Sequence, residues 1–295
     1  MADIQTVGVL GCGLMGSGIA QVAAQAGYRT VVREVSDDLN AKGKARIEGS
    51  LGKLVDKGKL SDGDRKAVLD RLSFTTSLKD LRRSDIVVEA VTEDLEVKNA
   101  LWRELDGLCP EGTIFASNTS SLTIAAMAAA TNRGDRFVGL HFFNPVPLMK
   151  LVEVVRTVTT SAATFERALA FGKSLGKEPI AAKDSSGFIV NLLLVPYLLD
   201  AIRALEHGVG SVADLDKGMT LGTGHPMGPF TLLDFVGLDT TYRIAEIMFN
   251  EYREARYAPP PLLRRMVLAG MLGKKSGKGF YDYSTTPPSV TNLGL

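Results

Sequence analysis

A glycine-rich turn near the N-terminus constrains the fold of this chain more than any other feature of its sequence. The apolar run 4–10 is typical of a short buried strand, and the segment GCGLMG follows it directly. The next residues are small and predict a helix that ends at Gly27, after which a second apolar run, 28–35, begins. A strand, a helix and a second strand in this order predict a βαβ unit with parallel strands.

The turn itself has the spacing G-x-G-x-x-G, formed by Gly11, Gly13 and Gly16. Glycines have no side chain, so their backbone at the N-terminus of a helix can approach a pyrophosphate closely. The pattern therefore predicts a dinucleotide-binding site. Glu34, at the end of the second strand, stands where an acid reaches the adenine ribose hydroxyls, which favours NAD over NADP, although Arg33 beside it weakens that preference. A tight turn in another α/β protein, an FAD enzyme and a methyltransferase remain alternatives.

The rest of the chain divides by composition. Further strands are expected at 84–91, 112–118, 137–143 and 150–157. Alternating helices and strands predict a Rossmann-type, doubly wound α/β sheet, the NAD-binding domain, over residues 1–184. Long apolar helical runs follow and predict an all-α domain over 185–295, for substrate binding and dimerisation.

Charge and cysteine content narrow the class of partner. The chain has 34 basic and 33 acidic side chains, so it lacks the electrostatic footprint of a protein that binds nucleic acid or an anionic membrane. Two cysteines far apart in the sequence favour a reducing, cytoplasmic setting over a disulfide framework. No basic leader or membrane-length apolar run is visible, and the histidines and cysteines lack metal-ligand spacing.

His141 is the most promising candidate for chemistry, because it ends a predicted strand at the edge of the sheet where ligands bind. Glu153 follows twelve residues later, in the next predicted strand, and a turn could bring the two together. A carboxylate bonded to one imidazole nitrogen fixes the tautomer and leaves the other nitrogen free to accept an alcohol proton. Alternatively, the histidine packs between Phe142 and Phe143, and the glutamate is solvated or pairs with a neighbouring lysine.

Several segments together resemble a known enzyme family. They are GCGLMGSGIAQ, SNTSSL (117–122), RFVGLHFFNPVPLMKLVEVV, GFIVN (187–191), HPMGPF (225–230) and GKKSGKGFYDY (273–283). In this order they resemble the L-3-hydroxyacyl-CoA dehydrogenases, most closely the short-chain 3-hydroxybutyryl-CoA enzymes, from residue 4 to about residue 284. The resemblance implies NAD-dependent oxidation of a 3-hydroxyacyl-CoA to the 3-ketoacyl-CoA and the reverse, in a homodimer.

The resemblance also implies roles for particular residues. His141 would be the general base, Glu153 would orient it, and Ser120 and Asn191 would hold the substrate. Cofactor contacts would come from Gly11, Gly13, Leu14, Met15, Gly16, Glu34, Glu93, Lys98 and Asn118. Coenzyme A phosphates would meet Lys53 and Lys57.

Each implied role has an ordinary structural alternative. Ser120 could cap a helix, and Asn191 could be satisfied at its own helix end. Lys98 could belong to a charged helix face, where it is spaced to pair with Asp94. The two lysines 53 and 57 could form a solvated basic face.

Three positions depart from the family pattern, and two other functions remain open. Glu34 replaces the usual aspartate, Ser186 the usual proline of the interdomain hinge, and Leu192 the usual arginine.

A relative that oxidises a free hydroxy acid or sugar acid would not need Lys53 and Lys57. A structural NAD-binding protein without catalytic activity would not need His141.

Overall fold

The computed structural model describes residues 4–294, which divide into two compact units between Phe188 and Ile189. The division falls after Phe188 rather than after residue 184, where composition places it. The reason is that Phe188 is buried within a core cluster of the first unit. Ser186 is also buried, and its hydroxyl donates to the carbonyl oxygen of Ser121 at 2.6 Å.

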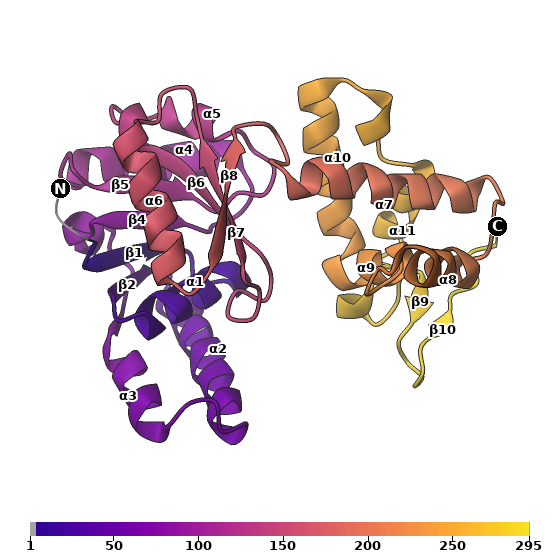
Figure 1. Ribbon diagram of the computed structural model, residues 1–295, viewed down its shortest axis with the longest axis horizontal. Helices are drawn as coiled ribbons and strands as arrows, with labels where there is room; N and C mark the ends of the chain where they lie inside the picture. The colour runs from indigo at the N-terminus through magenta and orange to yellow at the C-terminus, as the bar shows by residue number, and fades with distance from the viewer. Residues whose placement is uncertain (1–3, 295) are drawn as a thin grey trace. The chain divides into compact units, whose positions relative to one another are not determined.

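The first unit is built on an eight-stranded sheet with the order β3-β2-β1-β4-β5-β6-β7-β8. Figure 1 labels these strands except β3. Adjacent strands are parallel except β6 and β7, which are antiparallel. The strands are β1 (Thr6–Leu10), β2 (Arg29–Arg33), β3 (Leu72–Thr75), β4 (Ile86–Glu89), β5 (Ile114–Ser117), β6 (Phe137–Phe142), β7 (Leu151–Arg156) and β8 (Glu178–Lys183). Six match the apolar runs in the sequence. The outermost strands, β3 and β8, were not predicted, because they are short of buried apolar side chains and β8 contains a proline.

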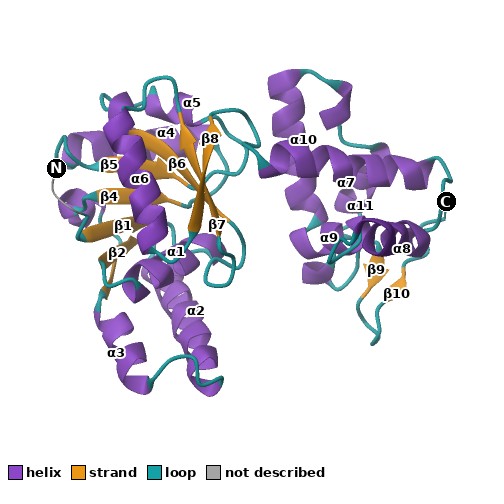
Figure 2. Ribbon diagram, in the orientation of Figure 1, coloured by secondary structure: helices purple, strands orange, loops and turns teal. Residues whose placement is uncertain are grey.

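Helices cover both faces of this sheet (Figure 2), which confirms the doubly wound fold. One face packs on α1, α2, α3 and α6, and the other on α4, α5 and the short helix η1. Their bounds are α1 (Leu14–Gln25), α2 (Asp37–Asp56), α3 (Asp62–Asp70), η1 (Leu78–Arg83), α4 (Leu95–Leu108), α5 (Ile124–Ala128), η2 (Gly134–Arg136) and α6 (Ala162–Ser174). Serine or aspartate side chains cap the N-termini of α2, α3, α4 and α6, which fixes where these helices begin.

The second unit is helical, as predicted, with a small added hairpin. Its elements are α7 (Val190–Glu206), α8 (Val212–Thr223), α9 (Pro229–Val236), α10 (Leu238–Tyr252), η3 (Ala255–Tyr257), α11 (Pro261–Leu268), η4 (Lys274–Ser276), β9 (Tyr281–Asp282) and β10 (Ser289–Val290). The buried carboxylate of Asp234 accepts hydrogen bonds from the backbone of Phe280 and Tyr281, which attaches the C-terminal segment to α9. No helix within residues 4–294 is long and apolar enough to span a bilayer.

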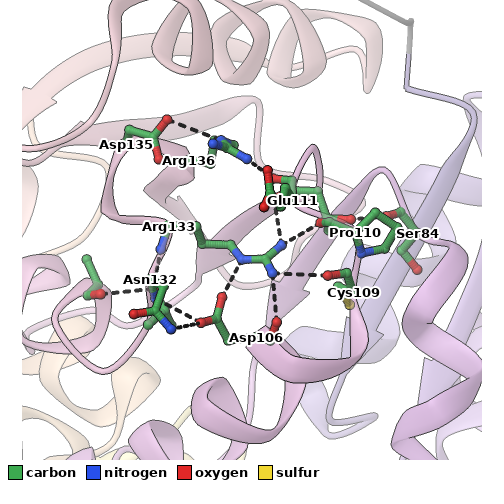
Figure 3. Close-up of polar contacts among 12 residues, drawn as sticks. Ser84, Asp106, Cys109, Pro110, Glu111, Asn132, Arg133, Asp135 and Arg136 are labelled. Atoms are coloured by element: carbon green, nitrogen blue, oxygen red, sulfur yellow. Dashed lines mark hydrogen bonds and ion pairs between the residues drawn. The ribbon is translucent and has the colours of Figure 1, made fainter.

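A buried arginine joins the end of α4 to the loop that leads into β6 (Figure 3). Arg133 is 5% exposed, pairs with Asp106 at 2.5 Å and lies 4.4 Å above the ring centre of Phe115. Its guanidinium also donates to the carbonyl oxygens of Asp106, Cys109 and Pro110, at the C-terminal end of α4. Burial raises the pKa of Asp106, but hydrogen bonds from Asn132 and Arg133 and the Arg133 charge outweigh that effect and leave the pKa below its ordinary value. This junction supports the strand that carries His141.

Replacing Arg133 with methionine should therefore lower the free energy of unfolding by about 3–5 kcal/mol, because it removes the buried charge that pairs with Asp106 and the donor to several carbonyl oxygens. Urea denaturation measures the change. Arg136→Met is the matched control, since Arg136 is half-exposed and pairs with the exposed Asp135, and it should cost less than about 1 kcal/mol. Equal stability of the two variants would contradict the structural role of Arg133.

Candidate active site

The three glycines of the turn serve different purposes. Gly11 has φ +87°, and a Cβ there would lie 2.6 Å from the carbonyl oxygen of Ala90. A Cβ on Gly16 would lie 1.9 Å from the carbonyl oxygen of Gly11. Gly11 and Gly16 are thus required by the turn and by its packing. Gly13 has φ −67° and nothing within 4 Å of a Cβ position, so the protein itself does not require a glycine there.

Open space over Gly13 fits the pyrophosphate of a dinucleotide. Gly13 is the N-cap of α1, has no side-chain cap hydrogen bond, and precedes a first turn without acidic residues. The backbone N–H groups and the positive end of the helix therefore face a space that a side chain would partly fill. Leu14, the first residue of α1, is exposed beside this space, whereas Met15 packs against the core.

Glu34 lies next to the glycine turn, as the sequence predicts. Its carboxylate accepts hydrogen bonds from the backbone of Cys12 at 2.6 Å and of Val35 at 3.1 Å. Burial and the nearby Glu34 charge raise the pKa of the Cys12 thiol to about 12, so this thiol is protonated and unreactive. Arg33 is directed to the carbonyl oxygen of Thr76 at 3.2 Å. The expected contact of Glu34 with the adenine ribose stays a prediction.

His141 and Glu153 are brought together by strand pairing. In the antiparallel register of β6 and β7 they are opposite each other, and directly opposed side chains share one face of a sheet. Nδ1 of His141 lies 2.6 Å from Oε2 of Glu153. The side chains are 7% and 0% exposed. Both alternatives for Glu153 are wrong. Its side chain is fully buried, so it is not solvated, and Lys150 lies 3.9 Å from Glu178 instead.

Two aromatic rings limit the orientation of the imidazole. Phe143 and Phe188 have ring centres 4.5 Å and 5.6 Å from that of His141. A carboxylate beside Nδ1 accepts the proton on that nitrogen, so the neutral ring has Nε2 as its basic nitrogen. The arrangement can therefore take one proton at Nε2 and stabilise the resulting imidazolium from the opposite side.

The SNTSS turn (117–121) lies at the same edge of the sheet, since it follows β5. Oδ1 of Asn118 accepts from the backbone of Phe142 at 2.9 Å, which attaches the turn to the end of the histidine strand. Glu93 accepts from the backbone of Ser120 at 3.1 Å and from the hydroxyls of Thr119 and Ser121. Ser120 and Asn118 thus sit on a turn whose backbone is held in place.

Lys98 is buried rather than on a charged surface. It is 1% exposed, and its ammonium lies 2.5 Å from Glu89 and 3.3 Å from Glu93. The alternative in which Lys98 pairs with Asp94 is wrong, because the ammonium pairs with Glu89 and Glu93 and Asp94 caps the N-terminus of α4. Burial raises the pKa of Glu93, but Lys98 and the hydrogen bonds from Thr119 and Ser120 hold that pKa below its ordinary value.

Sequence reasoning missed Glu89 and Ser117, which are fully buried at the carboxyl ends of β4 and β5. A signal was present, because both are polar residues that end apolar strands at the ligand-binding edge. Among the described residues, no group of three or more histidine, cysteine or acidic side chains is arranged to hold a metal ion.

The remaining predicted residues lie elsewhere. Lys53 is in the last turn of α2 and Lys57 is its C-cap, and both are exposed. Asn191 is the second residue of α7, in the second unit. Leu192 packs against the core of that unit. The coenzyme A contacts and the role of Asn191 stay predictions.

Comparison with known proteins assigns the chain to a family. The model of the 3-hydroxyacyl-CoA dehydrogenase NAD-binding domain matches residues 6–185, and that of the C-terminal domain of the same enzymes matches residues 187–283. This chain belongs to the 3-hydroxyacyl-CoA dehydrogenase family. The assignment confirms the predicted fold, the NAD cofactor and the oxidoreductase class, and it excludes the FAD-enzyme and methyltransferase alternatives.

Relatives of this dehydrogenase match it along nearly their whole length. A 3-hydroxybutyryl-CoA dehydrogenase of Mycobacterium tuberculosis is 51% identical over 286 residues, 96% of this chain and 100% of the relative. The mitochondrial hydroxyacyl-coenzyme A dehydrogenase of Homo sapiens is 50% identical over 95% of this chain and 91% of its own. A crystal structure of (S)-3-hydroxybutyryl-CoA dehydrogenase from Ralstonia eutropha superposes with a TM-score of 0.92 and 45% identity, covering 96% and 100% of the chains.

Proposed function

We propose that this enzyme oxidises an L-3-hydroxyacyl-CoA, with 3-hydroxybutyryl-CoA preferred, to the 3-ketoacyl-CoA and catalyses the reverse, with His141 as general base. The buried contact of 2.6 Å between His141 Nδ1 and Glu153 Oε2, at the carboxyl edge of the NAD-binding sheet, is the observation that supports it. The names of the similar proteins from M. tuberculosis and R. eutropha support the four-carbon substrate.

Four side chains take part in the proposed reaction. Nε2 of His141 takes the proton of the 3-hydroxyl group, and Glu153 stabilises the imidazolium that forms. The Ser120 hydroxyl donates to the substrate oxygen, and Asn191 helps to hold the substrate. In the reverse direction the imidazolium returns its proton to that oxygen.

NAD, when bound, supplies the electron acceptor for oxidation at C3. Gly11, Gly13 and the N-terminus of α1 would hold its pyrophosphate. Glu34 would bind the adenine ribose. The nicotinamide ribose would be bound by Glu93, Lys98 and Asn118.

Coenzyme A would be recognised by Lys53 and Lys57 at the C-terminal end of α2. Both side chains are exposed, so a phosphate can reach them from the solvent. We further propose a cytoplasmic homodimer formed through the helical unit, which exposes large apolar side chains, among them Leu193, Leu221 and Leu268.

An assay of NADH formation with 3-hydroxyacyl-CoA substrates of increasing length, and with free 3-hydroxybutyrate, tests the proposal. NAD should support turnover far better than NADP, and kcat/KM should be highest at four carbons and at least about 100-fold lower for the free acid, which lacks the binding energy of coenzyme A. Equal activity on the free acid would make the enzyme a hydroxy-acid dehydrogenase. No NADH from any 3-hydroxyacyl-CoA would make it a non-catalytic protein.

A further inference from the structure

The structure contains a buried charged assembly centred on Glu89, the last residue of β4. Glu89 is 0% exposed, and its carboxylate has three hydrogen-bond donors. Oε1 accepts from the ammonium of Lys98 at 2.5 Å and from the backbone of Val91 at 2.8 Å. Oε2 accepts from the hydroxyl of Ser117 at 2.6 Å.

One branch of the assembly reaches the SNTSS turn through Ser117. This residue ends β5, lies opposite Glu89 in the strand register and is fully buried. Its O–H group donates to Glu89, and its oxygen accepts from the backbone N–H of Thr119 at 3.2 Å. The backbone of Asn118 also donates to the carbonyl oxygen of Glu89 at 2.8 Å. Both residues that precede Ser120 are therefore tied to Glu89.

A second branch reaches the same turn through Lys98. The ammonium bridges Glu89 to Glu93, and Glu93 accepts from the backbone of Ser120. Two separate routes thus connect one buried carboxylate to one short turn. In a dry environment such charged hydrogen bonds are strong and directional, so they restrict the turn to one conformation.

Stability alone is a weak reason for this arrangement. Burying charged groups costs desolvation energy, and apolar residues of similar volume often replace a buried ion pair without loss. The assembly instead lies beneath the turn that carries Ser120, at the carboxyl edge of the sheet, where geometry matters for chemistry. A displacement of about 1 Å at a reacting group can cost about 100-fold in rate.

We propose that Glu89 is a positioning residue for the dehydrogenase reaction. Through Ser117 and Lys98 it fixes the turn 117–121 and so places the Ser120 hydroxyl for the substrate oxygen. The inference rests on the proposed function of Ser120. Because it acts through Ser120, the effect of breaking the Glu89 connection should vanish when the Ser120 hydroxyl is already absent.

A double-mutant cycle of Ser117→Ala and Ser120→Ala tests the inference. Ser117→Ala removes the hydroxyl that joins Glu89 to Thr119 and keeps the ion pair of Lys98 with Glu89. It should lower kcat by about 10- to 100-fold while the dissociation constant of NADH changes less than about 2-fold. Added to Ser120→Ala, it should lower kcat by less than about 2-fold more.

Ser84→Ala is the matched control, because Ser84 is a buried serine just before β4 whose hydroxyl has no hydrogen-bond partner within residues 4–294. It should keep wild-type kcat. The acidic limb of the pH–rate profile should also be the same in Ser117→Ala and wild type, because the His141–Glu153 pair is intact.

The possible failures are distinguishable. An unchanged kcat for Ser117→Ala, or losses that multiply in the double mutant, would overturn the positioning role of Glu89 and leave that of Ser120 standing. An unchanged kcat for Ser120→Ala would overturn the proposed role of Ser120, and the inference with it. Should Ser117→Ala not fold, Glu89→Gln enters the same cycle with the same expected outcomes for kcat.

Discussion

Replacing His141 with glutamine should lower kcat for oxidation of 3-hydroxybutyryl-CoA by about 10²- to 10⁴-fold and leave NADH affinity unchanged. Glutamine cannot take up the hydroxyl proton that Nε2 accepts. Its amide can still donate to Glu153, so the variant does not leave a buried carboxylate without a donor. Steady-state kinetics and a fluorescence titration with NADH measure the two quantities separately.

His225→Gln is the matched control for this change. His225 is exposed, and its Nδ1 atom lies 3.3 Å from the hydroxyl oxygen of Tyr197. The control should retain wild-type turnover. Wild-type turnover in His141→Gln would instead show that another group, or water, takes the proton.

Replacing Glu153 with glutamine should lower kcat by a similar factor, about 10²- to 10⁴-fold, although the imidazole is still present. The glutamine amide would donate to Nδ1, which places the proton of the neutral ring on Nε2, the nitrogen that must accept the substrate proton. The charge that stabilises the imidazolium is also lost. The pH–rate profile should therefore also differ from that of the wild type, which kcat/KM measured across the acidic range will show.

Glu178→Gln provides the control, because Glu178 is an exposed residue of β8 whose ion pair with Lys150 is 3.9 Å long. It should change neither kcat nor the profile. An unchanged profile and turnover in Glu153→Gln would mean that the carboxylate is only a packing partner of the histidine.

The sequence was informative where function depends on local backbone. Gly11, Gly13 and Gly16 follow a buried strand, and that context alone predicted the turn that the structure shows. The pairing of His141 with Glu153 was predictable as a possibility, because a turn between two apolar strands can form an antiparallel pair. Only the register of β6 and β7 puts the two side chains on one face.

The buried charges were not predictable, because they come together from elements far apart in the chain. Ser117 and Glu89 are separated by 28 residues and meet because β4 and β5 are adjacent in the sheet. Lys98 is spaced to form an exposed ion pair with Asp94 on one face of a helix. In the structure, however, Lys98 lies in the first turn of α4 and its side chain points inward to Glu89. The division into compact units falls after Phe188 rather than after residue 184 for a similar reason, since Phe188 packs against strands and helices distant in sequence.

The most direct test of the central claim, that a carboxylate-oriented His141 takes the substrate proton, is a single-turnover measurement of NADH formation across pH. Wild-type enzyme, saturated with NAD and 3-hydroxybutyryl-CoA, should form NADH more slowly as the pH falls, because a general base must be unprotonated to accept the substrate proton. His141→Gln should form NADH at least about 100-fold more slowly, without that acidic limb. A variant that keeps both the wild-type rate and the acidic limb would contradict the assignment of His141 as the base.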